Sequence, residues 1–168
     1  MRYISTRGEC DPVTFSQAVA MGLAPDGGLY LPEKLPDLST RMLSWEDLSY
    51  EELTIAIFNE FADDIEPGRL RSLISGVYGE FNSKTIAPVL ELESRLYLAE
   101  LFHGPTLAFK DFALQLLGRL YEDQIRNTGK HLNALGATSG ATGAAAITGL
   151  QGKSRIKLLL VYPNGRIP

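Results

Sequence analysis

The chain has 168 residues, of which 45% are hydrophobic and 21% are charged. This length suits about one domain of roughly 100–200 residues, and the composition is that of a folded globular protein. Sixteen basic against twenty acidic residues give a net charge of −4, which argues against a nucleic-acid or anionic-membrane partner. The only cysteine, Cys10, excludes an internal disulfide, and no apolar run is long enough to span a bilayer. The chain opens without a signal-peptide pattern, so we expect a cytoplasmic protein.

The first half of the chain predicts short strands followed by helices. The predicted strands span 3–6 and 29–31, and a short helix is predicted at 14–21. Ser49 and Glu52 have the spacing of a capping box, which begins a helix with an apolar stripe ending at Phe61. A second stripe with a period of about 3.6 residues predicts an amphipathic helix over 70–81.

From residue 86 onward, strands and helices alternate. The predicted elements are a strand pair at 88–92 and 96–101, a helix at 111–126, a strand at 131–137, a helix at 140–152 and a strand at 156–162. This order predicts an α/β fold with a parallel sheet and helices on both faces. Because a parallel sheet normally continues, we expect the chain to be part of something larger.

One lysine lies where a Gly-Pro turn meets the start of a helix, in the segment 103–111. Lys110 has the apolar neighbours Leu107 and Phe109, and burial and the positive end of the helix dipole both disfavour a charged amine. An uncharged lysine is what Schiff-base chemistry requires. The alternative is an exposed lysine paired with Asp111. We interpret His103 as a structural residue rather than a partner of the lysine.

A glycine-rich turn at 136–143 joins a predicted strand to a predicted helix. Its hydroxyls and backbone amides suit a phosphate or carboxylate at the helix N-terminus. The spacing is neither that of a P-loop nor that of a dinucleotide fingerprint. The alternative is that the small residues only permit close packing of helix and sheet. No cluster of cysteine or histidine has metal-ligand spacing, so we predict no metal site.

These two segments resemble motifs of threonine synthases, which are pyridoxal-phosphate enzymes of the tryptophan-synthase β type. The stretch His-Gly-Pro-Thr-Leu-Ala-Phe-Lys-Asp-Phe at 103–112 is similar to the family's lysine motif. Thr-Ser-Gly-Ala-Thr-Gly at 138–143 resembles its Thr-Ser-Gly-Asp-Thr-Gly loop. The stretches 3–8 and 22–32 are similar to its N-terminal domain, and 162–166 resembles the stretch after the next strand.

The resemblance implies an incomplete type II pyridoxal-phosphate fold, with a threonine-synthase-like N-terminal domain at 1–85 and the first part of the catalytic domain at 86–168. The implied reaction converts O-phospho-L-homoserine and water to L-threonine and phosphate. Lys110 would be the catalytic residue. The residues expected to contact the cofactor are Lys110, Phe109, Ser139 and Thr142. The residues expected to contact the substrate are Thr106, Thr138, Ser139, Gly140, Ala141, Thr142 and Gly143.

Two departures from the family pattern shape these expectations. Family members are much longer, so we expect a fragment that lacks the loop for the cofactor phosphate and associates with its missing C-terminal part or with itself. Ala141 stands where the family usually has aspartate. A non-catalytic module, or an enzyme of the same fold acting on another amino acid, is the alternative. Arg166 is interpreted as a solvated loop residue, with a substrate-phosphate contact as its other reading.

Overall fold

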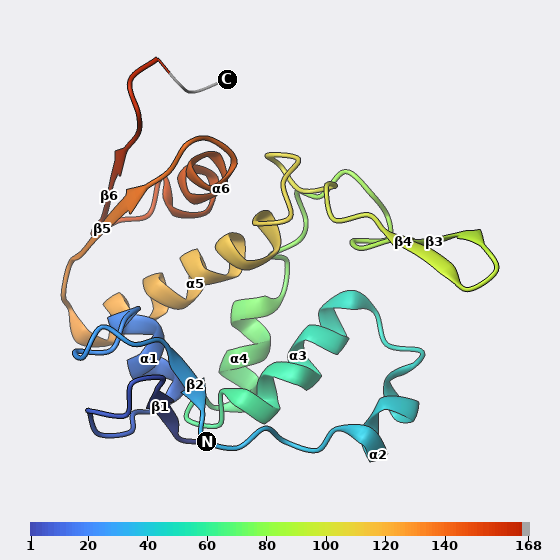
Figure 1. The fold of residues 1–168 in the computed structure, drawn as a ribbon, viewed down its shortest axis with the longest axis horizontal. Helices are drawn as coiled ribbons and strands as arrows, with labels where there is room; N and C mark the ends of the chain where they lie inside the picture. The colour runs from blue at the N-terminus through green and yellow to red at the C-terminus, as the bar shows by residue number, and fades with distance from the viewer. Residues whose placement is uncertain (166–168) are drawn as a thin grey trace. The chain divides into compact units, whose positions relative to one another are not determined.

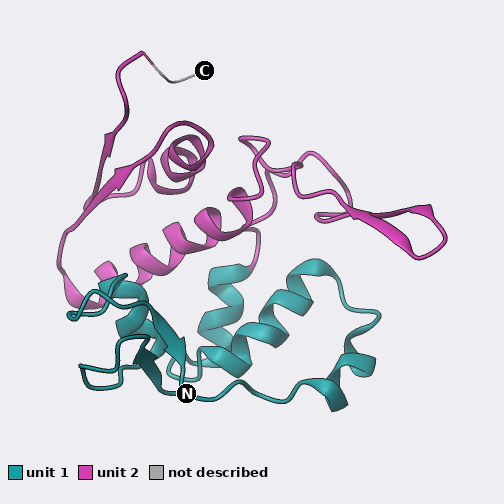
Figure 2. Ribbon diagram, viewed as in Figure 1, with its two compact units in different colours: residues 1–74 teal, residues 75–168 magenta. Residues whose placement is uncertain are grey.

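The computed structural model describes residues 1–165, which fall into two compact units (Figure 2). One unit comprises residues 1–74, and the other begins at residue 75. Each unit has its own secondary structure and buried side chains. The domain boundary that the family resemblance implies between residues 85 and 86 stays a prediction.

The first unit combines a small antiparallel strand pair with short helices (Figure 1). Its elements are β1 (Tyr3–Ser5), α1 (Phe15–Met21), β2 (Tyr30–Pro32), α2 (Ser39–Met42), a 3-10 turn at Leu43–Trp45, α3 (Tyr50–Phe61) and α4 (Pro67–Ile74). The predicted capping box is confirmed: the Ser49 hydroxyl accepts from the Glu52 amide, and the Glu52 carboxylate accepts from the Ser49 amide at 2.9 Å. The predicted helix at 14–21 is confirmed as well, with Thr14 as its N-cap.

Apolar side chains from the strands and helices of this unit share one core. Ile55, Leu70 and Ile74 are buried, and the Tyr3 hydroxyl donates to the carbonyl oxygen of Phe61 at 2.8 Å. This hydrogen bond joins β1 to the end of α3. It gives the hydroxyl of a buried tyrosine the partner that it needs, while the Tyr3 ring packs against Phe15.

The prediction of one helix over 70–81 is wrong beyond residue 74. Helix α4 ends at Ile74, and turns follow because Gly76 adopts a φ of +71°, which a continuing helix does not allow. Val77, Tyr78 and Phe81 are nevertheless buried, and the Phe81 ring lies 5.0 Å from that of Phe112. The apolar spacing therefore identified buried residues correctly and their backbone conformation incorrectly.

The second unit has a hairpin followed by alternating helices and strands (Figure 1). Its elements are β3 (Val89–Glu93), β4 (Leu96–Ala99), α5 (Asp111–Thr128), β5 (Leu132–Ala137), α6 (Ala141–Leu150) and β6 (Ile156–Val161). Strands β3 and β4 pair antiparallel, whereas β5 and β6 pair parallel from Leu132↔Ile156 to Ala137↔Val161. The predicted strand pair and the predicted parallel sheet are both confirmed.

The two faces of the parallel strand pair differ in burial. Ala134, Leu158 and Leu160 line the face next to α5 and α6, where residues of both helices surround them. The opposite face carries Leu135 and Leu159, whose side chains are 73% and 64% exposed. Within residues 1–165, helices therefore cover only one face of this sheet.

Helices α5 and α6 meet through glycines on both sides. A Cβ on Gly118 would overlap the carbonyl oxygen of Gly149, and a Cβ on Gly149 would lie 2.9 Å from the carbonyl carbon of Leu114. The helices thus touch backbone to backbone. Because α5 leads into the start of β5, its own first residue lies toward the opposite, carboxyl edge of the sheet, where α6 also begins.

Candidate active site

Lys110 is the last residue before α5, at the end of a loop made of successive tight turns. The Leu107 amide donates to the Gly104 carbonyl at 3.0 Å, and the Asp111 amide donates to the Ala108 carbonyl at 3.0 Å. The Lys110 carbonyl accepts from the Leu114 amide at 3.0 Å, which begins the helix. Backbone hydrogen bonds therefore fix the lysine's Cα on both sides.

The side chain of Lys110 lies beside an aromatic ring. Its Nζ is 4.4 Å from the centroid of the Phe109 ring, a cation–π distance, and the residue is half-buried. Within residues 1–165, Lys110 forms no ion pair with Asp111, so the alternative of a paired surface lysine is not observed. The Asp111 carboxylate instead accepts from the amide and the hydroxyl of Thr106, at 2.9 and 2.7 Å.

His103 contacts two residues that precede it in its own loop. Its Nε2 lies 2.6 Å from the Glu100 carboxylate, and its ring lies 4.8 Å from that of Phe102. These contacts support the interpretation of His103 as a structural residue.

The glycine-rich turn between β5 and α6 is open to solvent. The N-cap residue of α6 is Gly140, which has no side chain, and the Thr138 hydroxyl caps the helix from outside by accepting from the amides of Gly140 and Gly143 at 3.3 and 3.0 Å. Ser139 and Thr142 are exposed. Gly140 has a φ of +155° and a ψ of −101°, a conformation for which glycine is suited. The first turn of α6 contains no acidic residue, so the helix dipole there is not offset by a carboxylate.

Both segments belong to the same edge of the sheet. Lys110 precedes α5, the turn containing Ser139 precedes α6, and each helix starts toward the carboxyl ends of the parallel strands. Ligands of open α/β sheets bind outside this edge. An amine, exposed hydroxyls and the positive end of a helix together suit a ligand with an aldehyde and anionic groups.

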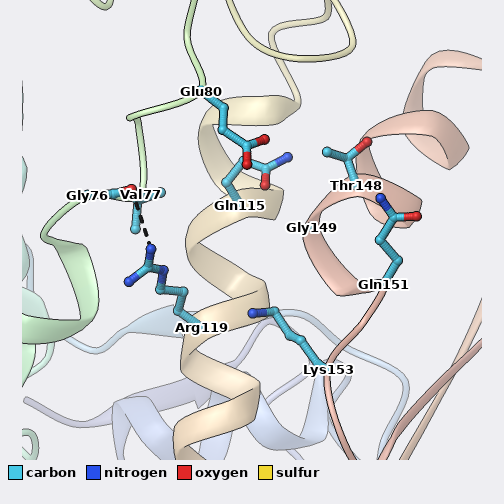
Figure 3. Close-up of a pocket in the computed structure, with 9 residues that line it drawn as sticks. All are labelled: Gly76, Val77, Glu80, Gln115, Arg119, Thr148, Gly149, Gln151 and Lys153. Carbon is cyan, nitrogen blue, oxygen red and sulfur yellow. Dashed lines mark hydrogen bonds between the residues drawn. The ribbon is translucent and has the colours of Figure 1, made fainter.

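A separate polar cavity of about 180 Å³ lies between α5, the end of α6 and residues 76–80 (Figure 3). Its cationic side chains are already engaged: Arg119 donates to the carbonyl of Gly76 at 3.4 Å, and Lys153 pairs with Glu122 at 3.2 Å. Among the described residues, the buried Nε2 of Gln115 has no hydrogen-bond partner. No motif in the sequence pointed to this cavity.

Comparison with known proteins agrees with this architecture. Residues 2–78 match the family described as "Threonine synthase N terminus". Threonine synthase from Pseudomonas aeruginosa is 42% identical over 99% of this chain and 36% of its own length. The structure of pyridoxal-phosphate-bound threonine synthase from Brucella melitensis superposes with a TM-score of 0.93, at 38% identity, over 100% of this chain and 37% of that one. The yeast enzyme gives a TM-score of 0.90 over 99% of this chain and 36% of that one.

Over nearly its whole length the chain is similar to the N-terminal part of threonine synthases. Its resemblance to that family and its α/β fold class are confirmed. The chain spans about a third of the length of the threonine synthases it matches. No helix within residues 1–165 has the length and apolarity to cross a membrane, and no group of three metal-ligating side chains forms there. Arg166 lies outside the described residues.

Sequence reasoning missed one participant of the site. The sequence suggests Asp111 as an alternative ion-pair partner of Lys110, yet its side chain is fully buried and accepts a hydrogen bond from Thr106. No residue spacing in the sequence signals that this carboxylate folds back onto its own loop.

Proposed function

We propose that the complete protein carrying this chain is a pyridoxal-phosphate-dependent lyase that converts O-phospho-L-homoserine and water to L-threonine and phosphate. The observation that carries this proposal is the match over the whole chain to a pyridoxal-phosphate-bound threonine synthase, at a TM-score of 0.93. The match of residues 2–78 to a threonine-synthase N terminus favours this activity over that of a related enzyme acting on another amino acid.

The residues of the carboxyl edge have the donor types that this cofactor needs. Pyridoxal phosphate, when bound, supplies an aldehyde and a ring that withdraws electrons from the substrate carbons. The Lys110 amine would hold the aldehyde and then take and return protons on those carbons. Phe109, whose side chain is 61% exposed, would pack beside the lysine and the cofactor.

The turn between β5 and α6 would bind the anionic groups. The exposed hydroxyls of Ser139 and Thr142 and the amides that open α6 are donors, and the helix dipole favours negative charge there. Gly140 and Gly143 would let the backbone approach the ligand, while Thr138 shapes the turn as a cap. Ala141 opens α6, and its methyl group would lie beside the bound ligand.

The uncovered sheet face supports a role within a larger fold. Leu135 and Leu159 are exposed on this face, and both faces of a parallel sheet are normally covered by other parts of a protein. We propose that the remainder of a catalytic domain, from the same polypeptide or a second chain, covers this face; a non-catalytic module that only associates would expose the same surface. A cytoplasmic location accompanies the proposed biosynthetic role.

The proposal is tested by loading the complete protein with pyridoxal phosphate, reducing it with borohydride and mapping the adduct by peptide mass spectrometry. We expect the label at Lys110 and not at the exposed Lys130, which follows α5. Phosphate release and threonine formation from O-phosphohomoserine are measured in parallel. Even labelling of all lysines would exclude the assigned cofactor site, and labelling without turnover would exclude the assigned reaction.

A further inference from the structure

The Asp111 side chain is an unusual feature of the second unit, because it is a carboxylate with no exposed surface. Burying a carboxylate is costly unless hydrogen bonds or charges compensate. Within residues 1–165, no cation pairs with it. Its compensation comes from Thr106, which gives it two hydrogen bonds, and from the N-terminus of the 18-residue helix α5.

The backbone closes around this carboxylate through Gly104. A Cβ at position 104 would lie 2.5 Å from the Asp111 Cβ and 2.8 Å from its Cγ, so any larger residue would collide with a side chain that has no room to move. Three residues farther on, Leu107 adopts a φ of +58°, a left-handed conformation that is rare for leucine. A strained residue of this kind persists only where its surroundings hold it.

Lys110 lies between these fixed points. The carboxylate that holds Thr106 belongs to the residue directly after the lysine, and Gly104 and Leu107 close the turn before it. Resting on the proposed function, we propose that Asp111 and Thr106 form a clamp that positions Lys110 for its reaction. In this assignment Thr106 is a positioning residue, and its hydroxyl is committed to Asp111 rather than to substrate.

The clamp makes a prediction that differs from that of a substrate contact. Loss of the Thr106 hydroxyl would loosen the loop and misdirect the lysine, and small misplacements of a reacting group cost up to about 10²-fold in rate. We expect Thr106→Val to lower kcat about tenfold and to leave KM within about twofold. A substrate contact would instead raise KM.

Three variants of the complete, cofactor-loaded protein separate these roles. Thr106→Ser keeps both hydrogen bonds and is expected to retain kcat within about twofold. Thr128→Val is the matched control, because it removes a hydroxyl that donates to the Gln124 carbonyl at the other end of α5. Asp111→Asn preserves the shape of the buried side chain and serves as the test if Thr106→Val does not fold; we expect it to lower kcat at unchanged KM.

Two measurements do not depend on turnover. Hydrogen exchange of the peptide covering residues 104–111 should accelerate in Thr106→Val and not in Thr106→Ser or Thr128→Val. The rate of borohydride-dependent labelling at Lys110 should fall in the same variant only. Faster exchange with unchanged labelling and kcat would reduce the clamp to a purely structural device, and a raised KM alone would return Thr106 to the substrate site. Absence of any label at Lys110 in the unaltered protein would overturn the proposed function itself.

Discussion

The loop before α5 and the turn before α6 start their helices in opposite ways. In the first, the polar groups satisfy one another: Asp111 is buried and its two hydrogen bonds come from Thr106. In the second, Ser139 and Thr142 are exposed, and among the side chains of the described residues 136–143 the Thr138 hydroxyl is the group that hydrogen-bonds within the turn. A closed loop is suited to hold one of its own side chains, whereas an open turn is suited to receive a ligand.

The difference predicts that the two segments tolerate substitution differently. Replacing a polar residue of the closed loop leaves a buried group without its hydrogen-bond partner, which lowers the free energy of unfolding as well as activity. Substitutions at exposed positions of the open turn remove contacts that form only when a ligand is bound. The predictions below separate these two kinds of effect.

The largest effect is expected from Lys110→Ala. Loss of the only amine in the closed loop should lower turnover by about 10³-fold or more, because proton transfer by a positioned group contributes roughly 10²–10⁴-fold. Steady-state kinetics of the complete enzyme measures it. Lys130→Ala, at an exposed position after α5, is the control and should retain activity. Comparable losses in both variants would show that Lys110 has no special role.

Gly104→Ala tests how tightly the first loop is closed. The added methyl would collide with the buried Asp111, and overpacking of this kind costs about 1–3 kcal/mol. Urea unfolding of the protein measures the change. Gly79→Ala is the control, since the nearest atom to its Cβ would be the Gly76 carbonyl oxygen at an ordinary 3.5 Å. Equal stability of Gly104→Ala and the unaltered protein would contradict the closed geometry.

Thr138→Val tests the hydrogen bonds that the Thr138 hydroxyl accepts within the open turn. Removing the hydroxyl leaves the amides of Gly140 and Gly143 without their acceptor, and loss of an N-cap costs about 1 kcal/mol. Thermal unfolding measures the loss. Thr138→Ser keeps the acceptor and should restore most of the stability. If both variants melt alike, the hydroxyl is not the cap.

Ser139→Ala is expected to leave folding nearly intact and to weaken binding. The side chain is exposed, so the free energy of unfolding should change by less than about 0.5 kcal/mol. Loss of one hydrogen bond to an anionic ligand should raise KM or the cofactor Kd by about tenfold. Kinetics and cofactor titration measure the two constants. A large loss of stability with unchanged binding would place Ser139 with the closed loop instead.

The smallest effect on stability is expected from Ala141→Asp, which introduces the aspartate that the family resemblance implies at this position. A carboxylate in the first turn of α6 should stabilise the helix by about 0.3–1 kcal/mol. We also expect turnover to rise. Thermal unfolding and steady-state kinetics measure these effects, and a lack of gain in turnover would show that position 141 does not take part in the reaction.

Local signals predicted most of the fold. The capping box at Ser49 and the small residues around the start of α6 are encoded within a few residues. The helix predicted to residue 126 ends in the structure at Thr128, where Gly129 adopts a φ of +67°. The error over 70–81 arose because the apolar period of a helix continues through Gly76, and burial by distant residues decides that segment.

The candidate site was only partly accessible from sequence. Lys110 and the glycine-rich turn were recognisable from residue types at helix starts, and the family resemblance gave them roles that stay predictions. The burial of Asp111 and its bonds to Thr106 depend on how the loop folds back, which no spacing rule specifies. Tertiary contacts of this kind are what propensities and periods leave out.

The glycine contact between α5 and α6 has a mechanical consequence. Where Gly118 and Gly149 bring two backbones together, no side chain at the contact can change rotamer to absorb a shift, so the peptide units there limit the offset between the helices. The same contact limits the separation between the amine that precedes α5 and the amides that open α6. Even a methyl group placed at this distant junction would alter the reach from lysine to anion without touching either.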